Sequence, residues 1–397
     1  MRIGVVTTSY PRFAGDPAGG FVEGHVEALR EIGHDVDVIA AGDGDGDRDR
    51  VGDRDRIGDR VGDRDRVGDR DGDGDGDDDR VRGREPARGG LRVLRVDGRG
   101  LFYRGGAPDA LERSPLGAGA AALGFTSRLA RAVARRAGGW DRVIAHWLVP
   151  SALAALAARR PLLAIAHGGD VFTLRRLGLL APMLGVLQRR DAQLVFVSAA
   201  LRGVAQAAAP RLAGWLDDAT IQPMGVDVAR FAALGRAPRS PPMILVAARL
   251  VPVKGVDVAI AAMRHLRRPA ELVIAGDGPE RARLRHPLLG QVPTATRDAL
   301  LRAASVVVIP SRVLPGGRTE GTPMIALEAL AAGVPVVASA VGGLCELSAV
   351  HLVPPGDPQA LAAAIDRVLA HPPSPEALRN SVASLDWRAT VHHLIRE

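Results

Sequence analysis

Residues 243–276 read MILVAARLVPVKGVDVAIAAMRHLRRPAELVIAG, and this stretch contains the repeating unit from which the fold can be predicted. Two short apolar runs, 243–248 and 271–276, enclose a polar loop and an amphipathic segment at 256–266 that is predicted to be a helix. Apolar strands of this length that alternate with helices are typical of parallel sheets covered on both faces. The stretch therefore predicts a strand–helix–strand unit of an α/β domain.

The same alternation of apolar runs and helical segments continues in both directions along the chain. Further apolar runs lie at 3–7, 36–40, 91–96, 142–147, 161–167, 193–198, 305–311 and 335–339. A stretch rich in Gly, Pro and Arg near 231–242 separates two series of such runs. We therefore predict an α/β protein with two Rossmann-like parallel-sheet domains that face a cleft, over residues 1–235 and 236–378. Residues 379–397 are predicted to form a helix that packs back on the amino-terminal domain.

The composition excludes several classes of site and singles out one residue. A length of 397 residues suits two domains, and the single cysteine, Cys345, excludes a disulfide framework, a four-cysteine zinc site and an iron–sulfur cluster. Cys345 has no partner histidine in its motif and is predicted to be a small core residue. Of the 52 basic residues, 51 are arginines and only Lys254 is a lysine. A chain with so strong an arginine bias is expected to keep lysine where arginine works poorly.

The formal net charge of +7 combines two unlike parts of the chain. Residues 42–80 consist of Gly, Asp, Arg and four aliphatic residues, with 16 Asp against 9 Arg, so they carry −7 and the remaining residues carry +14. Such a repeat buries too little apolar surface to offset the entropy of ordering, and we predict a disordered insertion without chemistry. A calcium-binding β-roll would need a regular nonapeptide period, which this stretch lacks.

Apolar runs in this chain are shorter than the ~20 residues that a membrane helix needs, and MRIGVV at the start lacks a signal-peptide core. We predict a cytoplasmic protein that is at most peripheral at the inner membrane face. The arginine-rich segments 127–136 and 174–190 suit anionic lipid, but a solvated helix face is the favoured interpretation. Nucleic acid is not a predicted partner, because few aromatic side chains are interleaved for base stacking.

Ligands of open parallel sheets bind at the carboxyl ends of the strands, so the loops after the strands are where chemistry is expected. The loop after 243–248 carries Arg249 and then Lys254-Gly255, directly before the predicted helix. Two cations beside the start of a helix form a site for an anion. A surface turn is the alternative interpretation, and the position of the chain's only lysine in this loop argues against it.

Two of the scarce glutamates lie in residues 318–333, RTEGTPMIALEALAAG. Thr322-Pro323, as N-cap and first helical residue, and Gly333 after the end predict a short helix. Glu320 then precedes the helix and Glu328 lies inside it, roughly 10 Å away at 1.5 Å per residue, which suits the two ends of an extended ligand. A surface salt bridge is the alternative for each; it is less favoured for Glu328, whose Ala and Leu neighbours make an unpaired carboxylate costly.

The amino-terminal half carries two further motifs. Gly19-Gly20 precede the first predicted helix and can bring the backbone close to a ligand. The run 161–167 ends in His167-Gly168-Gly169-Asp170, in which glycines separate a histidine from a carboxylate. A lone histidine at a strand end is more often packed than catalytic, but this context favours a functional role for His167. No such context surrounds three other histidines, His25, His34 and His146.

Taken in order, these motifs resemble the retaining, GT-B-fold glycosyltransferases of family 4, also called glycosyl transferases group 1. The matching elements are Gly19-Gly20, Gly33-His34, His167 to Asp170, Gly225-Val226-Asp227, Arg249 with Lys254-Gly255, Gly276-Asp277-Gly278, the E-x7-E pair Glu320 and Glu328, Gly342-Gly343 with Glu346, and 352–358. The resemblance spans nearly the whole chain except the repeat. Three departures are a 278–288 stretch that is shorter by roughly a helix, beside the expected nucleobase pocket, Met224 where the family often has asparagine, and the acidic repeat inside the amino-terminal domain.

The resemblance implies an acceptor-side amino-terminal domain and a donor-binding carboxy-terminal domain. Arg249 and Lys254 would bind the diphosphate of the donor and stabilise charge on the leaving group. Glu320 would bind hydroxyls of the transferred sugar and Glu328 those of the ribose, while His167 would act near the reacting carbon. Further donor contacts are implied for backbone groups of Gly19, Gly20, Thr322, Met324 and Ile325.

The implied activity is that of a hexosyltransferase (EC 2.4) that needs neither metal nor cofactor. It would move a sugar from a nucleotide-diphosphate donor to a lipid-linked or polysaccharide acceptor with retention of configuration, by front-face attack without a protein nucleophile. The lack of an obvious pair of catalytic carboxylates fits this mechanism. Two alternatives stay open. A nucleotide-sugar epimerase of the same fold is disfavoured by the complete E-x7-E pattern, and a non-catalytic nucleotide-sugar binding protein is suggested by the short 278–288 stretch.

Overall fold

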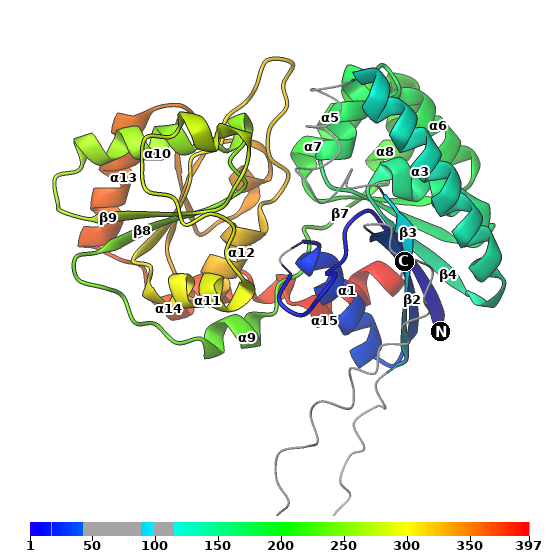
Figure 1. The fold of residues 1–397 in the computed structure, drawn as a ribbon, viewed down its shortest axis with the longest axis horizontal. Helices are drawn as coiled ribbons and strands as arrows, with labels where there is room; N and C mark the ends of the chain where they lie inside the picture. Colours follow the sequence, from blue (N-terminus) through cyan, green and yellow to red (C-terminus); the bar gives the residue numbers. More distant parts are fainter. Residues whose placement is uncertain (17, 43–88, 99–114, 397) are drawn as a thin grey trace, which may run out of the picture.

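The computed structural model describes residues 1–16, 18–42, 89–98 and 115–396. The predicted insertion lies outside the described residues beyond Gly42. The chain forms two α/β bodies, each built around its own parallel sheet (Figure 1). This architecture confirms the predicted fold class of two Rossmann-like domains. Within the described residues, no helix combines the length and the apolar character that crossing a membrane requires.

The amino-terminal sheet has seven strands in the order β3-β2-β1-β4-β5-β6-β7, and every pair is parallel. Its strands are β1 (Arg2–Thr7), β2 (Asp35–Gly42), β3 (Leu91–Asp97), β4 (Arg142–His146), β5 (Leu162–Ala166), β6 (Gln193–Phe196) and β7 (Thr220–Ile221). The strand order reverses between β1 and β4, where Val5 pairs with Val38 on one side and Ile144 on the other. The loops after β1 and β4 therefore diverge at the place where open sheets bind ligands.

Helices cover this sheet because their apolar residues face it. They are α1 (Gly20–Glu31), α3 (Pro115–Arg136), α4 (Leu153–Ala155), α5 (Gly169–Arg176), α6 (Leu180–Arg189), α7 (Ala199–Ala208) and α8 (Ala213–Asp217). In α1, the residues Val22, Val26 and Leu29 recur at helical spacing and are fully buried against the sheet. The buried core under α3 includes Phe125 and Trp140, whose indole N–H donates to the Asp37 carboxylate at 2.8 Å.

The carboxy-terminal sheet has five parallel strands in the order β12-β11-β10-β8-β9. They are β8 (Met243–Ala247), β9 (Glu271–Ala275), β10 (Val306–Ile309), β11 (Val336–Ser339) and β12 (Val350–Val353). The helices are α9 (Val228–Ala233), α10 (Val256–Ala262), α11 (Thr294–Ala303), α12 (Met324–Ala331), α13 (Pro358–Ala370) and α14 (Pro375–Asn380). The order reverses between β8 and β10, so the loops after these two strands are the expected ligand loops of this sheet.

The last helix, α15 (Trp387–Arg396), returns to the amino-terminal domain and lies beside α1 (Figure 1). Trp387, Val391 and Leu394 are buried as part of the amino-terminal core. The described chain thus ends on the domain in which it began, which ties the two domains together at a second place besides the segment between β7 and β8.

Two local predictions are wrong. Thr322 does not cap α12: the helix begins at Met324 with Pro323 as N-cap and has no side-chain cap, because the Thr322 hydroxyl instead donates to the Val197 carbonyl across the domain boundary at 2.8 Å. Cys345 is not a core residue but is exposed, since it lies on a short 3-10 helix at Gly342–Glu346 that turns its buried face, Gly343 and Leu344, inward.

Candidate active site

The loop after β8 brings the only lysine to a carboxylate of the E-x7-E pair. Residues Pro252–Lys254 form a single 3-10 turn that ends at Gly255, whose φ of 57° lies in the left-handed region. A Cβ at Gly255 would lie 2.1 Å from the Pro310 carbonyl oxygen, so the turn can pack against the end of β10 only with glycine there. Lys254 Nζ then lies 2.7 Å from Glu320 Oε1.

The Glu320 carboxylate is held from a second direction. The Ser311 hydroxyl, buried at the end of β10, donates to the same Glu320 oxygen at 3.0 Å. The side chains of Lys254 and Glu320 keep 23% and 11% of their surface exposed, so the pair is shielded from water but still open to a ligand. A charge-assisted hydrogen bond in such surroundings is stronger than one at a fully hydrated surface. The loops after β8 and β10 are therefore joined by a polar contact that a ligand can reach.

Arg249 adds positive charge to this place. Partial withdrawal from water lowers the pKa of its guanidinium, the nearby Arg318 lowers it further, and Glu320 raises it. Arg249 itself remains exposed to solvent over part of its surface. An arginine stays charged under these conditions. Arg249, Lys254 and Glu320 thus form one cluster with an excess of positive charge.

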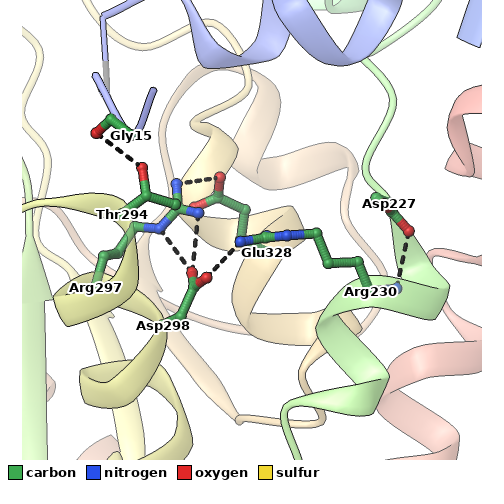
Figure 2. Close-up of polar contacts among 7 residues, drawn as sticks. All are labelled: Gly15, Asp227, Arg230, Thr294, Arg297, Asp298 and Glu328. Atoms are coloured by element: carbon green, nitrogen blue, oxygen red, sulfur yellow. Dashed lines mark hydrogen bonds and ion pairs between the residues drawn. The ribbon is translucent and has the colours of Figure 1, made fainter. Parts of the chain in front are cut away.

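The second carboxylate of the pair, Glu328, lies in a separate network of charges (Figure 2). Arg297 on α11 donates from Nη1 to Glu328 Oε1 at 2.9 Å, and its Nε and Nη2 atoms donate to Asp298 Oδ1 at 3.2 and 3.0 Å. Arg230 contacts the other oxygen of Asp298, and the Asp227 side chain caps α9 by accepting from the Arg230 N–H. Both glutamates therefore have cationic partners, but the pair formed by Glu328 is largely withdrawn from the surface and is not the surface salt bridge considered as the alternative.

The pKa of the Glu328 carboxyl is raised, and removal from water is the main cause. Arg297 opposes this effect, Asp298 adds to it, and Arg230 again lowers the pKa. Only 12% of the Glu328 side chain is exposed. The Glu328 charge is therefore maintained chiefly by Arg297, a residue that no sequence motif identified. The role of Arg297 depends on the packing of α11 against α12, which the local sequence does not contain.

The loop between β1 and α1 of the amino-terminal domain reaches this region. The Thr294 hydroxyl at the start of α11 donates to the Gly15 carbonyl oxygen at 3.2 Å, beside the Arg297 network (Figure 2). Gly19, with a φ of 76°, is the N-cap of α1, and no side chain caps this helix start. A Cβ on Gly20 would meet nothing within 4 Å. The Gly19-Gly20 turn thus leaves the uncapped beginning of α1 accessible.

Asp170 organises the turn that carries His167. Its carboxylate accepts from the backbone N–H groups of His167 and Gly168 at 3.1 and 2.9 Å, and from that of Leu148 after β4 at 2.7 Å. Burial raises the Asp170 pKa, and the hydrogen bonds from Leu148 and Gly168 oppose the rise. Asp170 is therefore an internal support that fixes the ends of β4 and β5 to each other, with its carboxylate turned away from solvent.

His167 lies at the contact between the two domains. A Cβ on Gly321 would lie 2.8 Å from the His167 carbonyl oxygen, so the residue after Glu320 must be very small for the domains to approach this closely. The His167 ring is surrounded by Phe21 and Trp147, with ring centroids 5.1 and 4.9 Å away. His167, Glu320 and Lys254 thus come from three loops that meet at one place.

His146 and His25 extend from His167 into the core. His146 Nδ1 lies 3.0 Å from His167 Nε2, and His146 Nε2 lies 3.1 Å from His25 Nδ1. Both residues are fully buried, as the packed interpretation predicted for a lone histidine. Their contact with His167 was missed, although His146 ends β4 beside the strand that leads to His167. That strand order was needed to see the connection.

The remaining predicted contacts lie around the start of α12. Met324 packs against the cores of both domains and Ile325 against the carboxy-terminal core. Glu346 reaches the other domain and accepts from the N–H groups of Ala199 and Ala200, at the start of α7, at 3.0 and 3.1 Å. Within the described part of the chain, no three His, Cys, Asp or Glu side chains are arranged to hold a metal ion.

The fold and this site define a two-domain α/β protein with a cationic cluster at the carboxyl ends of its sheets. Residues 241–371 match the family of glycosyl transferases group 1. Solved structures of the same fold include sucrose-phosphate synthase from Thermosynechococcus elongatus, with a TM-score of 0.64, 22% identity, and coverage of 100% of this chain and 98% of that one. Anabaena Alr3699/HepE in complex with UDP-glucose gives a TM-score of 0.63 at 19% identity, with the same coverage of both chains.

Curated relatives agree with this assignment. TuaC of Bacillus subtilis strain 168, named as a teichuronic acid biosynthesis glycosyltransferase, is 32% identical over 251 residues, which are 57% of this chain and 61% of TuaC. The D-inositol 3-phosphate glycosyltransferase of Xylanimonas cellulosilytica is 31% identical over 265 residues, 55% of this chain and 60% of that relative. This chain thus spans about three fifths of the length of these relatives. The carboxy-terminal domain thus matches the group 1 glycosyltransferases, and the two-domain fold is that of the solved GT-B structures, in agreement with the resemblance found in the sequence.

Proposed function

We propose that the protein is a retaining glycosyltransferase that transfers a sugar from a nucleotide-diphosphate donor to a hydroxyl of a lipid-linked or polysaccharide acceptor. The observation that carries this proposal is the cluster of Arg249, Lys254 and Glu320 in a group 1 glycosyltransferase domain. Two cations and one carboxylate at the carboxyl ends of a parallel sheet match the diphosphate and the hydroxyls of such a donor. An isolated surface salt bridge would not need the buried serine that supports Glu320.

In the proposed reaction, the bond between the anomeric carbon and the diphosphate oxygen breaks while the acceptor oxygen bonds to the same face of that carbon. The acceptor hydroxyl proton passes to the departing diphosphate, which closes the balance of atoms and charge. Arg249 and Lys254 would stabilise the negative charge that develops on the leaving group. The cations that this chemistry needs are present as side chains, which supports a reaction independent of metal.

The two glutamates would share the hydroxyl groups of the donor. Glu320, beside Lys254, would accept from hydroxyls of the sugar, and Glu328 would accept from those of the ribose. Arg297 already donates to Glu328, so a ribose would bind at an ion pair and not at an isolated carboxylate. The Anabaena protein of the same fold has been solved with UDP and with UDP-glucose, which supports this class of donor.

Relatives support a glycan or lipid-linked acceptor, since their names include teichuronic acid and colanic acid biosynthesis.

A surface of the amino-terminal domain fits peripheral contact with an anionic membrane. Leu177 and Leu179, at the turn between α5 and α6, are 51% and 50% exposed, directly after Arg175 and Arg176. Exposed leucines beside arginines suit the headgroup region of a cytoplasmic membrane face. Flotation with anionic vesicles, and its loss in a Leu177→Ser/Leu179→Ser variant, tests this placement.

The activity itself is tested in two steps. A panel of nucleotide sugars is first screened by thermal shift, because a donor bound to the folded state raises its stability. The donors that bind are then incubated with and without glycan and lipid-linked acceptors. Transfer with retained anomeric configuration, seen by NMR and unaffected by a chelator, is the expected result. A sugar epimerised without acceptor would establish the epimerase instead, and binding without turnover over the full acceptor panel would favour a binding protein.

A further inference from the structure

His25, His146 and His167 form a continuous row of ring nitrogens through the amino-terminal domain. Their nitrogen–nitrogen distances of 3.1 and 3.0 Å are those of hydrogen bonds. The three residues come from α1, the end of β4 and the loop after β5, so the row crosses the point where the strand order reverses. One end of the row lies in the core and the other lies at the contact between the domains.

The row has only two ways to place its protons. Burial lowers the pKa of His25 to about 4 and that of His167 to about 3, and it lowers the pKa of His146 as well, so all three rings are neutral near pH 7. A neutral imidazole has one N–H and one lone pair. Because both nitrogens of His146 are engaged, it must donate to one neighbour and accept from the other. Either every ring donates toward His167, or every ring donates toward His25.

The inner end of the row distinguishes the two patterns. His25 Nε2 is buried and has no hydrogen-bond partner among the described residues, and the His25 ring stacks on Trp387 at a centroid distance of 5.7 Å and an angle of 12°. Donation toward His25 would leave an N–H at this nitrogen without an acceptor, whereas donation toward His167 leaves only a lone pair there. Buried N–H groups without an acceptor are the rarer of the two defects. Donation toward His167 is therefore the favoured pattern.

The same end shows that the row is not a path for protons. A proton taken up at His167 and passed inward would arrive at His25, where Trp387 covers the ring and, in the part of the chain that the structure describes, no acceptor continues the row. It would leave a buried imidazolium, which burial disfavours. The row can orient a ring but cannot carry a proton away.

We propose that His25 and His146 are positioning residues that hold His167 as the Nδ1–H tautomer, so that His167 acts as a hydrogen-bond donor to a ligand hydroxyl and not as a base. His167 Nε2 accepts from His146, and its Nδ1–H is left for a ligand. Aromatic contacts from Phe21 and Trp147 fix the plane of the ring. Trp147 has a φ of 71°, a conformation rare for a non-glycine residue, so the strained backbone of this residue lies directly beside His146 and its ring contacts His167. The identity of the ligand rests on the proposed function, but the tautomer does not.

The tautomer is tested on the ligand-free protein. Selective ¹⁵N labelling of histidine and long-range ¹H–¹⁵N spectra distinguish a protonated from an unprotonated ring nitrogen, and the His167→Asn variant identifies the His167 signals by their loss. We expect Nδ1 of His167 to be protonated and Nε2 to be unprotonated at pH 7. A protonated Nε2, or an imidazolium, overturns the proposal whether or not any sugar is transferred. The expected tautomer in a protein that turns over no nucleotide sugar would leave this inference standing and refute the proposed function.

Variants of His25 test the positioning role. His25→Phe keeps a ring on Trp387 but removes the Nδ1–H donor, and we expect a mixed tautomer at His167 and a fivefold to twentyfold lower kcat with little change in KM for the donor. His25→Gln offers an amide N–H and is expected to restore at least half of the lost kcat. His34→Phe, a histidine in the same domain outside the row, is the control. Unchanged His167 spectra and kcat in folded His25→Phe would overturn the role; if this variant does not fold, the wild-type spectra decide.

Discussion

At the scale of single residues, Lys254 connects the composition of the chain to its chemistry. Every other basic residue is arginine, and yet this position, at the reversal point of the carboxy-terminal sheet, has a lysine whose ammonium contacts Glu320 at 2.7 Å. An ammonium group is compact and can contact a carboxylate and a phosphate at the same time, whereas a guanidinium is planar and larger. The rarity of the residue and its geometry therefore lead to the same functional conclusion.

Lys254→Arg should weaken the donor site although it keeps the charge. The longer side chain cannot place two short contacts in the same space, and we expect the donor Kd to rise by about tenfold, which corresponds to ~1.4 kcal/mol. Isothermal titration with the donor found by thermal shift measures this. Arg239→Lys, at an exposed pair with Glu271 whose side chains are about half exposed, is the matched control and should bind normally. Full donor affinity in Lys254→Arg would contradict the role given to the lysine.

At the scale of elements, the strands that carry the site could be predicted and the contacts between helices could not. Buried parallel strands read as continuous apolar runs, and β8 and β10 were found in this way. Two edge strands, β7 and β12, were missed because they are short and only partly buried. Thr322 was misjudged because its hydroxyl has a partner in the other domain, which the local sequence does not contain.

The site residues that follow strands could likewise be predicted, and those that depend on contacts between helices could not. The strand ends supplied Arg249, Lys254 and His167, because the residues after a buried strand stand out against its apolar run. Arg297 and Glu346 were not assigned a role at the site, since each depends on which helix packs against which. An arginine on an exposed-looking helix has no distinctive spacing in a chain with 51 arginines.

The ion pair between α11 and α12 should be asymmetric in its effect on stability. Arg297 has both Glu328 and Asp298 as partners, whereas among the described residues Glu328 is ion-paired with Arg297 alone. We expect Arg297→Met to lower the free energy of unfolding by about 3 kcal/mol, because it leaves a buried carboxylate unpaired. Glu328→Gln should cost less than half as much. Urea unfolding of both variants and of the double variant measures the coupling. Equal losses in the two single variants would refute this description of the network.

At the scale of the whole molecule, the two domains are joined by a few polar contacts at their facing loops. The Glu346 carboxylate caps the start of α7 in the other domain, and Thr322 donates to Val197 at the end of β6. A carboxylate at a helix start is stabilised by the exposed N–H groups and the helix dipole. These contacts are small enough to break and form again during a reaction cycle.

Glu346→Gln should therefore open the molecule more than it destabilises either domain. Loss of the charge at the start of α7 is expected to cost about 1 kcal/mol of interdomain contact, seen as a larger radius of gyration by small-angle scattering without donor. Ser198→Ala is the control: it removes the hydroxyl that caps the same helix from within its own domain, and it should lower stability without opening. Equal radii for Glu346→Gln and wild type would show that the contact does not hold the domains together.

The three buried histidines should make the amino-terminal domain the acid-sensitive part of the molecule. Their pKa values lie below the unfolded value near 6.5, with His25 at about 4 and His167 at about 3, so the unfolded chain binds protons that the folded one does not. Their effect on stability is absent above pH 6.5, and stability falls as the pH drops from 6.5 toward 4. Each histidine contributes up to about 1.4 kcal/mol per pH unit. Asp170 has the opposite effect on stability. Because its pKa is raised in the folded state, the folded protein binds a proton more readily than the unfolded chain, and this contribution to stability rises as the pH falls.

Calorimetry between pH 7.5 and 4.5 measures this sensitivity, with the two domains followed by separate transitions or by hydrogen exchange. We expect the transition of the amino-terminal domain to shift down steeply below pH 6.5, toward unfolding of that domain before the other, because domains are stable by only about 5–15 kcal/mol. His25→Phe removes one buried titrating ring and should reduce the slope by about a third. A slope that is unchanged in this variant, or a carboxy-terminal domain that unfolds first in acid, would show that the histidine row does not control the response to pH.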